Sequence, residues 1–271
     1  VRELENLMIR QGININKETD VEKISIINGK AENVVLNNGK KIPADLVICN
    51  ADPPTVYSEM LPSEYSRDSL LKPKKFTHYS MGLYVLFFGS KKKFSDVAHH
   101  TIWMSERYKE LLHDIFEKKI LTEDFSLYLH RPTATDDTFA PEGCDSFYVL
   151  CPVPNLQGNV QWNSEGPKLK DRIVEALDKT IMPGLKENIE AEFWMTPEDF
   201  KNDYRSKYGA GFSVAPIFSQ SAWFRYHNKD KKIPNLYFSA AGSHPGAGIP
   251  GVLCSAKVIE KLIIKDFKVS H

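Results

Sequence analysis

The residues with the clearest chemical pattern lie at Gly246-Ala247-Gly248-Ile249-Pro250-Gly251, which satisfies G-x-G-x-x-G. Glycines let the backbone approach a planar or anionic ligand, and N–H groups at the start of a following helix can donate to it. A dinucleotide fingerprint is also followed by a second parallel strand and an acidic residue about twenty positions on. A single helix follows here, so the run does not open a first βαβ unit. A tight turn without a ligand is the alternative.

Other catalytic and metal-binding patterns are weak. The eight histidines include no H-E-x-x-H motif, and the adjacent His99 and His100 cannot share one face of a regular helix or strand. We therefore predict no metal site. The sequence lacks G-x-S-x-G, which excludes a nucleophile elbow. Asp136 and Asp137 follow Pro and Thr residues, a pattern typical of a solvated turn rather than an acid/base pair.

The glycine run must be positioned by α/β elements on either side of it. Residues 235–241 predict a buried strand and residues 252–264 an apolar-faced helix, so the run is a strand-to-helix corner where ligands often bind. The first fifty residues predict a helix that ends at Gly12, followed by short Val- and Ile-rich strands. We expect these strands over 13–16, 21–27, 31–36 and 45–49, with positive-φ turns at Asn28-Gly29 and Asn38-Gly39.

The middle of the sequence alternates between predicted strands and helices without a repeat. It predicts strands over 79–88, 125–130, 146–151 and 189–195, helices over 106–119 and 168–181, and a helix that starts at Thr196-Pro197-Glu198-Asp199. This order is typical of an α+β insertion. We expect its aromatic residues Tyr84, Phe87 and Phe88 to lie in the core rather than in a binding stripe.

Composition excludes several classes of protein. Of 271 residues, 42% are hydrophobic, and Lys plus Arg (35) equals Asp plus Glu (35), so a dedicated nucleic-acid binder is not expected. The cysteines form no C-x-x-C pair and lie in apolar runs, so we expect buried thiols; they are Cys49, Cys144, Cys151 and Cys254. Residues 235–256 carry no charge but contain two prolines and four glycines, which favours a turn over a membrane span.

Four stretches of the sequence resemble the bacterial-type phytoene desaturases. They are LTEDFSLYLH at 121–130, GCDSFYVL at 143–150, QSAWFR at 220–225 and GSHPGAGIPGV at 242–252. The likeness extends over nearly the whole chain. These enzymes are flavoproteins that desaturate long isoprenoid hydrocarbons, so the resemblance implies FAD as cofactor and a carotenoid precursor as substrate.

The resemblance implies an α/β fold in which an FAD-binding Rossmann-like domain, of the glutathione-reductase or amine-oxidase type, carries an inserted α+β substrate domain. Mapped onto this chain, residues 1–61 and 232–271 belong to the FAD-binding domain and residues 62–231 to the substrate-binding domain. Family members open with a βαβ unit whose glycines cradle the FAD pyrophosphate, and this sequence contains no such unit. It resembles the C-terminal part, so we expect the chain alone to bind FAD weakly and to be inactive.

Cofactor contacts follow residue by residue from the resemblance. It implies that the backbone of Val21 meets the adenine, although a strand valine in a core is an equal alternative. It places Asn50 and Ala51 beside the cofactor, and Gly242 and Ser243 near its ribityl and pyrophosphate groups. The helix start that approaches the pyrimidine side of the flavin comprises Gly248, Ile249, Pro250, Gly251 and Val252. His244, beside this corner, is the candidate catalytic base, with a turn-stabilising role as the alternative.

The implied function is the FAD-dependent desaturation of phytoene to a more conjugated product such as lycopene. Alternatives are a related carotenoid isomerase, oxygenase or later-step desaturase, or a truncated non-catalytic fragment that binds an apolar ligand or a partner chain. The substrate is nearly insoluble in water, so we expect a cytoplasmic protein that associates peripherally with the membrane surface.

Overall fold

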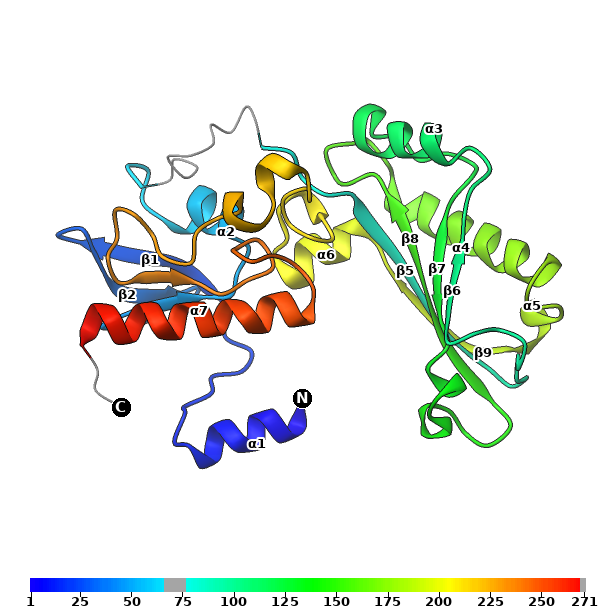
Figure 1. Ribbon diagram of the computed structural model, residues 1–271, viewed down its shortest axis with the longest axis horizontal. Helices are drawn as coiled ribbons and strands as arrows, with labels where there is room; N and C mark the ends of the chain where they lie inside the picture. The colour runs from blue at the N-terminus through cyan, green and yellow to red at the C-terminus, as the bar shows by residue number, and fades with distance from the viewer. Residues whose placement is uncertain (66–76, 269–271) are drawn as a thin grey trace.

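The computed structural model describes residues 1–65 and 77–268, and they form two groups of elements (Figure 1). One group holds the first four strands, β10 and the C-terminal helix α7. The other is a five-stranded sheet with its helices. Helix α1 (Arg2–Arg10) lies apart from both groups in Figure 1, and none of its residues is buried. Its apolar stripe, predicted correctly as helical, therefore has no cover within the described residues.

The hairpin predicted near the start of the chain is confirmed. Strands β1 (Val21–Ile27), β2 (Lys30–Leu36) and β3 (Lys41–Pro43) form an antiparallel sheet in that order. Asn28 (φ 50°) and Gly29 (φ 76°) form the turn, and both adopt the positive φ that a two-residue hairpin loop requires. The strand predicted over 13–16 was wrong, because those residues pair with no strand among the described residues and a strand needs hydrogen-bonded neighbours.

A parallel strand pair carries the glycine-rich corner. Strand β4 (Val47–Cys49) pairs with β10 (Leu236–Phe238), although they are almost 200 residues apart in sequence. Helix α7 (Ile249–Phe267) follows and starts three residues earlier than predicted, so the end of the glycine run forms its first turn. After β4 the chain forms α2 (Pro53–Thr55), which continues as a π-turn over Val56–Met60.

The hydrophobic core beneath this corner decides where the insertion ends. Ile24, Leu236 and Phe238 form this core together with Val214 and Tyr226. Val214 and Tyr226 fall within the range 62–231 that the sequence assigned to the substrate domain. The chain therefore returns to the core of the first group before residue 232. Residues 66–76 and 269–271 of the assigned ranges lie outside the described residues.

The five-stranded sheet is antiparallel, with the order β6-β7-β8-β5-β9. Its strands are β5 (Gly82–Ser90), β6 (His100–Trp103), β7 (Leu127–His130), β8 (Asp145–Val153) and β9 (Ile189–Met195). Helix α4 (Trp162–Lys179) covers one face, where Leu169 and Ile173 pack against Tyr84 and Phe88 (Figure 1). Phe87 was predicted for the core but lies on the uncovered face, because consecutive strand residues point to opposite faces.

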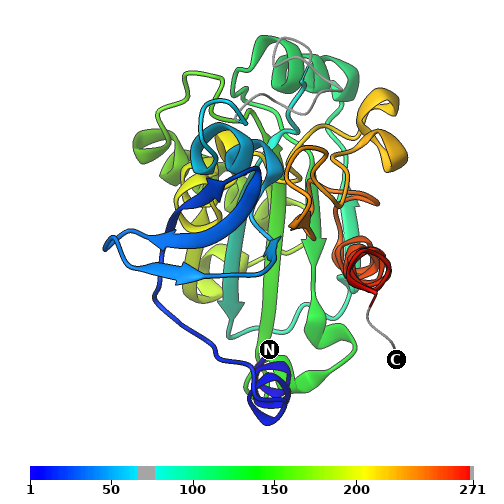
Figure 2. The same cartoon turned by 90° about the vertical axis from the view of Figure 1, so that its left-hand side faces the viewer.

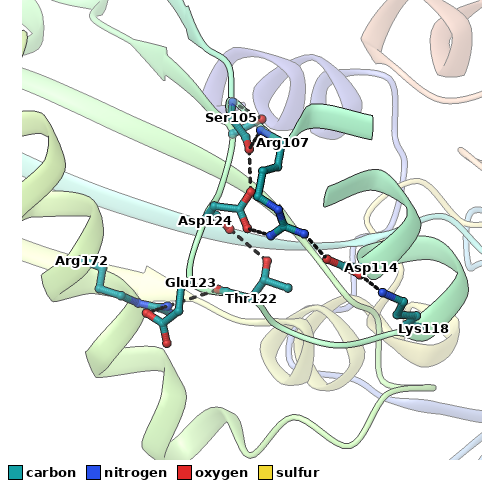
Figure 3. A network of polar contacts seen from close by, with 9 residues as sticks. Ser105, Arg107, Asp114, Lys118, Thr122, Glu123, Asp124 and Arg172 are labelled. Atoms are coloured by element: carbon teal, nitrogen blue, oxygen red, sulfur yellow. Dashed lines mark hydrogen bonds and ion pairs between the residues drawn. The ribbon is translucent and has the colours of Figure 1, made fainter. Parts of the chain in front are cut away.

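A polar network fastens the segment between β6 and β7 to α4 (Figure 3). This segment contains α3 (Tyr108–His113), which continues as a π-turn over Asp114–Lys118. Arg107 donates to Asp124 at 3.0 Å and to Asp114 at 3.3 Å, and Lys118 donates to Asp114 at 2.7 Å. Arg172 of α4 donates to the Thr122 carbonyl at 3.2 Å. The LTEDFSLYLH stretch thus begins as a docking loop and ends as strand β7.

Three further predictions concern a helix start, the burial of the cysteines and a membrane span. The helix start predicted at Thr196-Pro197-Glu198-Asp199 is confirmed, since Thr196 is the N-cap of α6 (Pro197–Tyr204) and forms a capping box with Asp199. Helix α5 (Leu185–Asn188) is a single turn. Cys49 and Cys151 are buried as expected, but Cys144 is half-buried and Cys254 is exposed, because an apolar run on a surface helix still leaves one side in solvent. No described helix combines the length and the apolar character needed to cross a membrane.

Candidate functional site

A hollow of about 490 Å³ lies where the parallel strands β4 and β10 end. The carboxyl ends of parallel strands are where open α/β sheets bind ligands. Its lining residues are Asn50, Ala51, Asp52, Phe200, Tyr204, Ser206, Ala210, Gly211, Ser213, Ala240, Ala241, Gly242 and Val252. The structure therefore brings together four of the residues singled out by the sequence analysis, Asn50, Ala51, Gly242 and Val252, from opposite ends of the chain.

Gly242 packs too closely against its neighbours to carry a side chain. A Cβ built there would lie 2.6 Å from Ser213 Oγ, 2.7 Å from Pro53 Cδ and 2.8 Å from Asp52 Oδ1. The Asn50 side-chain amide also donates to the Ser239 carbonyl at 2.5 Å. The segment after β4 and the turn after β10 are thus held side by side as one wall of the hollow.

Arg225, to which no role was assigned from the sequence, holds this wall in place. Arg225 is 4% exposed and donates to the carbonyls of Ala241 (3.0 Å), Phe212 (2.8 Å) and Gln220 (3.4 Å). Burial lowers the pKa of its guanidinium, and the carboxylate of Asp52 opposes that shift. Arg225 belongs to the QSAWFR stretch, which was the one available signal for it. It acts on the site through the backbone that it fastens.

Asp52 carries the carboxyl group of the hollow. Its Oδ1 accepts a hydrogen bond from the Ser213 hydroxyl, and its Oδ2 accepts one from the Lys207 backbone N–H at 3.2 Å. Burial raises the pKa of Asp52, and these two hydrogen bonds partly oppose the shift. The hollow is therefore polar at this wall and can hold hydrogen-bonding groups of a ligand.

The start of helix α7 forms the neighbouring edge. Its N-cap, Gly248, has φ 94° and ψ 147°, and no side chain caps the helix. Gly248, Ile249 and Pro250 are exposed, whereas Val252 lines the hollow. The first N–H groups of a helix without a side-chain cap are open to a ligand, and the helix dipole favours negative charge there. This edge suits an anionic or electron-rich group.

Seven predicted site residues are not among those that line the hollow. Four of them, Gly248 to Gly251, belong to the start of α7 described above, and the other three are Val21, Ser243 and His244. Val21 is the first residue of β1 and pairs with Leu36. Ser243 is fully buried, and its hydroxyl donates to the Ala240 carbonyl and accepts from the Ala240 N–H, both at 2.9 Å. The His244 ring packs edge-on against Trp223 at 6.2 Å, and its Nδ1 is buried with no hydrogen-bond partner among the described residues. The Ser243 side chain thus stabilises the turn, whereas the His244 ring keeps one nitrogen without a partner among the described residues.

A second hollow of about 490 Å³ lies on the uncovered face of the five-stranded sheet. Its lining is predominantly apolar and aromatic. The rings of Phe87 and Phe193 stack at 4.5 Å, and Tyr148 lies 5.8 Å from Phe87. Phe139, which is 60% exposed, lines the same hollow. Such a surface binds the hydrocarbon part of a ligand by removing apolar area from water.

Three histidines meet beside this second hollow, which the sequence analysis did not foresee. His99 Nε2 lies 2.8 Å from His130 Nε2, and His100 completes a group whose ring nitrogens all lie within 4.8 Å of one another. The rule that adjacent residues cannot share one face of a regular strand does not apply to His99 and His100, because only His100 lies in β6. His99 precedes strand β6 and escapes its alternation, while the strand register pairs His100 with His130. Burial lowers the pKa of His130, and His99 and His100 add to that shift.

Comparisons of sequence agree with this geometry. Residues 2–258 match the family described as flavin containing amine oxidoreductase. The chain is 44% identical over 250 residues to the lycopene-forming phytoene desaturase of Pantoea ananas, which covers 91% of this chain and 50% of that enzyme. It is 42% identical to the neurosporene-forming phytoene desaturase of Rhodobacter capsulatus, over 93% of this chain and 49% of that enzyme. The chain thus spans about half the length of the curated relatives that it matches.

Comparisons of structure support the same fold. An oxidoreductase from Methanosarcina mazei superimposes with a TM-score of 0.57 at 17% identity, over 95% of this chain and 52% of that chain. A putrescine oxidase variant superimposes with a TM-score of 0.52 at 11% identity, over 91% of this chain and 48% of that chain. The α/β fold of FAD-binding Rossmann-like type, expected from the sequence, is confirmed. Since the family match extends over nearly the whole chain, the protein belongs to the flavin-containing amine oxidoreductases.

Proposed function

We propose that this chain forms part of an FAD-dependent desaturase that introduces double bonds into a carotenoid precursor such as phytoene. The observation that carries the proposal is the hollow at the ends of β4 and β10, where Asn50, Gly242 and Val252 meet beside the start of α7. The relatives named above are desaturases of phytoene, so a carotenoid isomerase or oxygenase is not favoured. FAD is the flavin form that we propose for the family's cofactor.

The residues of the hollow fit a flavin. Gly242 keeps the wall flat, because any side chain there would collide with Ser213 and Asp52. The start of α7, which no described side chain caps, brings partial positive charge to the same edge and would favour an electron-rich part of a bound flavin there. When bound, the flavin supplies the two-electron oxidation that the removal of two hydrogens from a saturated carbon pair needs. The residues of this chain would orient the flavin ring and provide the polar wall on one side of it.

The aromatic hollow on the five-stranded sheet suits the hydrocarbon. Phe87, Tyr148 and Phe193 offer stacked faces to a polyene and keep water away from it. His244 stays our candidate proton acceptor, and the buried, unpartnered Nδ1 of its ring supports that role. A His244→Gln variant that retains full desaturation would remove it.

We further propose that the protein draws its substrate from the surface of a membrane, on the cytoplasmic side. An aromatic patch formed by Ile217, Phe218, Trp223 and Phe224 supports this, since Phe218 is 87% exposed and Trp223 67% exposed. Exposed aromatic side chains anchor proteins at the membrane–water interface. Because the formal net charge is zero, we expect binding to depend on buried apolar area more than on salt.

The test of the activity uses the protein with FAD and phytoene-loaded liposomes, with products separated by chromatography and identified by absorption. A parallel chimera joins this chain to the half of the Pantoea ananas enzyme that it does not match. We expect products with more conjugated double bonds from the chimera, and little or none from the chain alone. A product that has the same number of double bonds would identify an isomerase. A chain that binds apolar ligands but gives no product in either format would be the non-catalytic fragment.

The membrane proposal has its own test. We expect the protein to sediment with liposomes in high salt and to be released by detergent. Replacing Phe218 and Trp223 with serine should reduce the bound fraction, whereas replacing the exposed aromatic pair Tyr108 and Phe267, which lies outside the patch and lines neither hollow, should not. Equal sedimentation of both double variants would contradict the assignment of the patch.

A further inference from the structure

We propose that His99, His100 and His130 form a binding site for a divalent transition metal ion that prefers imidazole ligands, such as Zn²⁺. The site lies at one edge of the five-stranded sheet, where β6 begins and β7 ends. None of its three ligands lines the flavin hollow, but His130 also lines the aromatic hollow proposed for the hydrocarbon, so the test below reads metal binding and not desaturation.

The spacing of the ring nitrogens fits an ion. His99 Nε2 and His130 Nε2 lie 2.8 Å apart, and a nitrogen of His100 lies within 4.8 Å of both. Zn–N bonds of 2.0–2.1 Å in a tetrahedral site separate the ligand nitrogens by roughly 3.4 Å. Side-chain rotations that move these nitrogens by less than about 1.5 Å therefore complete the geometry.

Hydroxyl groups behind two of the rings already orient them. His100 Nδ1 lies 2.7 Å from the Tyr128 hydroxyl, and His99 Nδ1 contacts the Thr135 hydroxyl. Outer partners of this kind fix the ring and leave Nε2 free to bind a metal. The sheet supplies the rest of the alignment, because His100 and His130 are direct cross-strand partners and their rings stack at 5.2 Å.

The facing nitrogens of His99 and His130 are the ligands that an ion between the rings would use. His130 Nε2 meets only the equivalent nitrogen of His99. The other ring nitrogen of His130, Nδ1, is buried and has no partner among the described residues, and an ion at the facing nitrogens would leave it so.

An ion can reach the three histidines from solvent, and it would attach the edge strand to the sheet. His100 is exposed and His99 is half-buried, so an ion can reach the site from solvent. Three protein ligands leave a fourth position for water. Since β6 is an edge strand and pairs only with β7, an ion that joins His99 and His100 to His130 would tie that edge to the sheet.

The experiment titrates metal-stripped protein with Zn²⁺ by calorimetry and with Co²⁺ by visible absorption, which reports coordination geometry. We expect one ion per chain, ligand-field bands of a tetrahedral site, and a rise in melting temperature with Zn²⁺. His99→Ala, His100→Ala and His130→Ala should each weaken binding about tenfold or more. The matched control is His113→Ala, an exposed histidine at the end of α3, which should bind as the wild type does.

The readout is metal binding, so its result does not depend on flavin or substrate. Because His100 is exposed, its alanine variant keeps the core intact and remains informative even if His130→Ala fails to fold. Wild-type affinity in His100→Ala, an equal loss in His113→Ala, or no stoichiometric binding to the wild type would each overturn the proposal.

Discussion

The glycine corner and the five-stranded sheet each enclose a hollow of about 490 Å³, but they build it from different parts of the chain. In the corner the backbone makes the wall: Gly242 can carry no side chain, and Arg225 holds three carbonyl oxygens. On the sheet, alternate side chains such as Phe87 and Phe193 make the wall. Backbone walls are polar and side-chain walls can be wholly apolar, so one molecule presents surfaces for both a flavin and a hydrocarbon.

The two regions also differ in the groups that compensate a buried arginine. In the corner, the guanidinium of Arg225 is held by carbonyls, with the carboxylate of Asp52 contributing only at a distance. Under the sheet, Arg131 pairs directly with Asp145, and their side chains are 8% and 0% exposed. The corner is therefore fastened by hydrogen bonds to neutral carbonyls, whereas the sheet is anchored by a buried ion pair. The following predictions test this contrast in order of expected size.

The largest effect should follow Asp145→Ala. Asp145 accepts hydrogen bonds from the Phe94 N–H (2.7 Å), Arg131 Nε (3.0 Å) and the Thr133 hydroxyl (2.6 Å). Removing it leaves a buried guanidinium unpaired, which costs about 3–5 kcal/mol of unfolding free energy. Denaturant unfolding measures this. The control is Glu165→Ala, which removes an exposed pair with Lys168 and should change stability by less than about 1 kcal/mol. Similar values for the two variants would contradict the anchoring role.

The two faces of the sheet should separate stability from binding. Leu129 is 1% exposed in the core on the face that α4 covers, and Leu129→Ala should cost about 2–5 kcal/mol. Phe193 is 59% exposed on the open face, and Phe193→Ala should cost only about 1 kcal/mol through its lost stacking on Phe87. Phe193→Ala should nevertheless weaken the binding of a carotenoid, measured by fluorescence quenching. Unchanged binding would exclude this face as the hydrocarbon site.

In the corner, Gly248→Val should cost about 1–3 kcal/mol, because φ 94° strains a branched residue. In a form of the protein that retains flavin as the wild type, we also expect the variant to lose it. The measurement is the flavin absorbance per chain after gel filtration. Gly89→Val is the matched control, since its Cβ also meets no atom within 4 Å and its φ is ordinary. Wild-type flavin content in Gly248→Val would remove the start of α7 from the cofactor site.

The smallest effect concerns pH and the polar network of Figure 3. The hydrogen bond from Lys118 lowers the pKa of Asp114; burial opposes it, and the charges of Lys118 and Arg107 add to it. Because the folded pKa is depressed, the stabilisation is present above the unfolded value of about 3.9 and disappears as pH falls through the folded value. Melting temperatures should therefore be lower for Asp114→Asn than for the wild type at pH about 7 and should converge in strong acid. A constant difference at all pH values would contradict this.

Local chemistry predicted much of the fold. The Asn28-Gly29 turn, strand β9 and the helix start at Thr196 were all confirmed at their expected positions. Each of these features depends on residues close together in sequence. The turn needs two residues that accept positive φ, the cap needs two residues three positions apart, and the strand needs alternating apolar residues. The strand predicted over 13–16 failed because strand formation also needs a partner that local pattern does not reveal.

The sequence by itself determined the glycine corner, since Gly242 and Gly248 mark backbone positions that other residues fill poorly, and it determined the family. Only the tertiary structure decided what meets at that corner and what lies beside the sheet. Arg225 finds its carbonyls and His130 finds His99 and His100 through strand pairings that join distant segments. Backbone conformation is a local property that residue type reports directly, whereas the meeting of side chains depends on register and sheet order, which only the packed core selects.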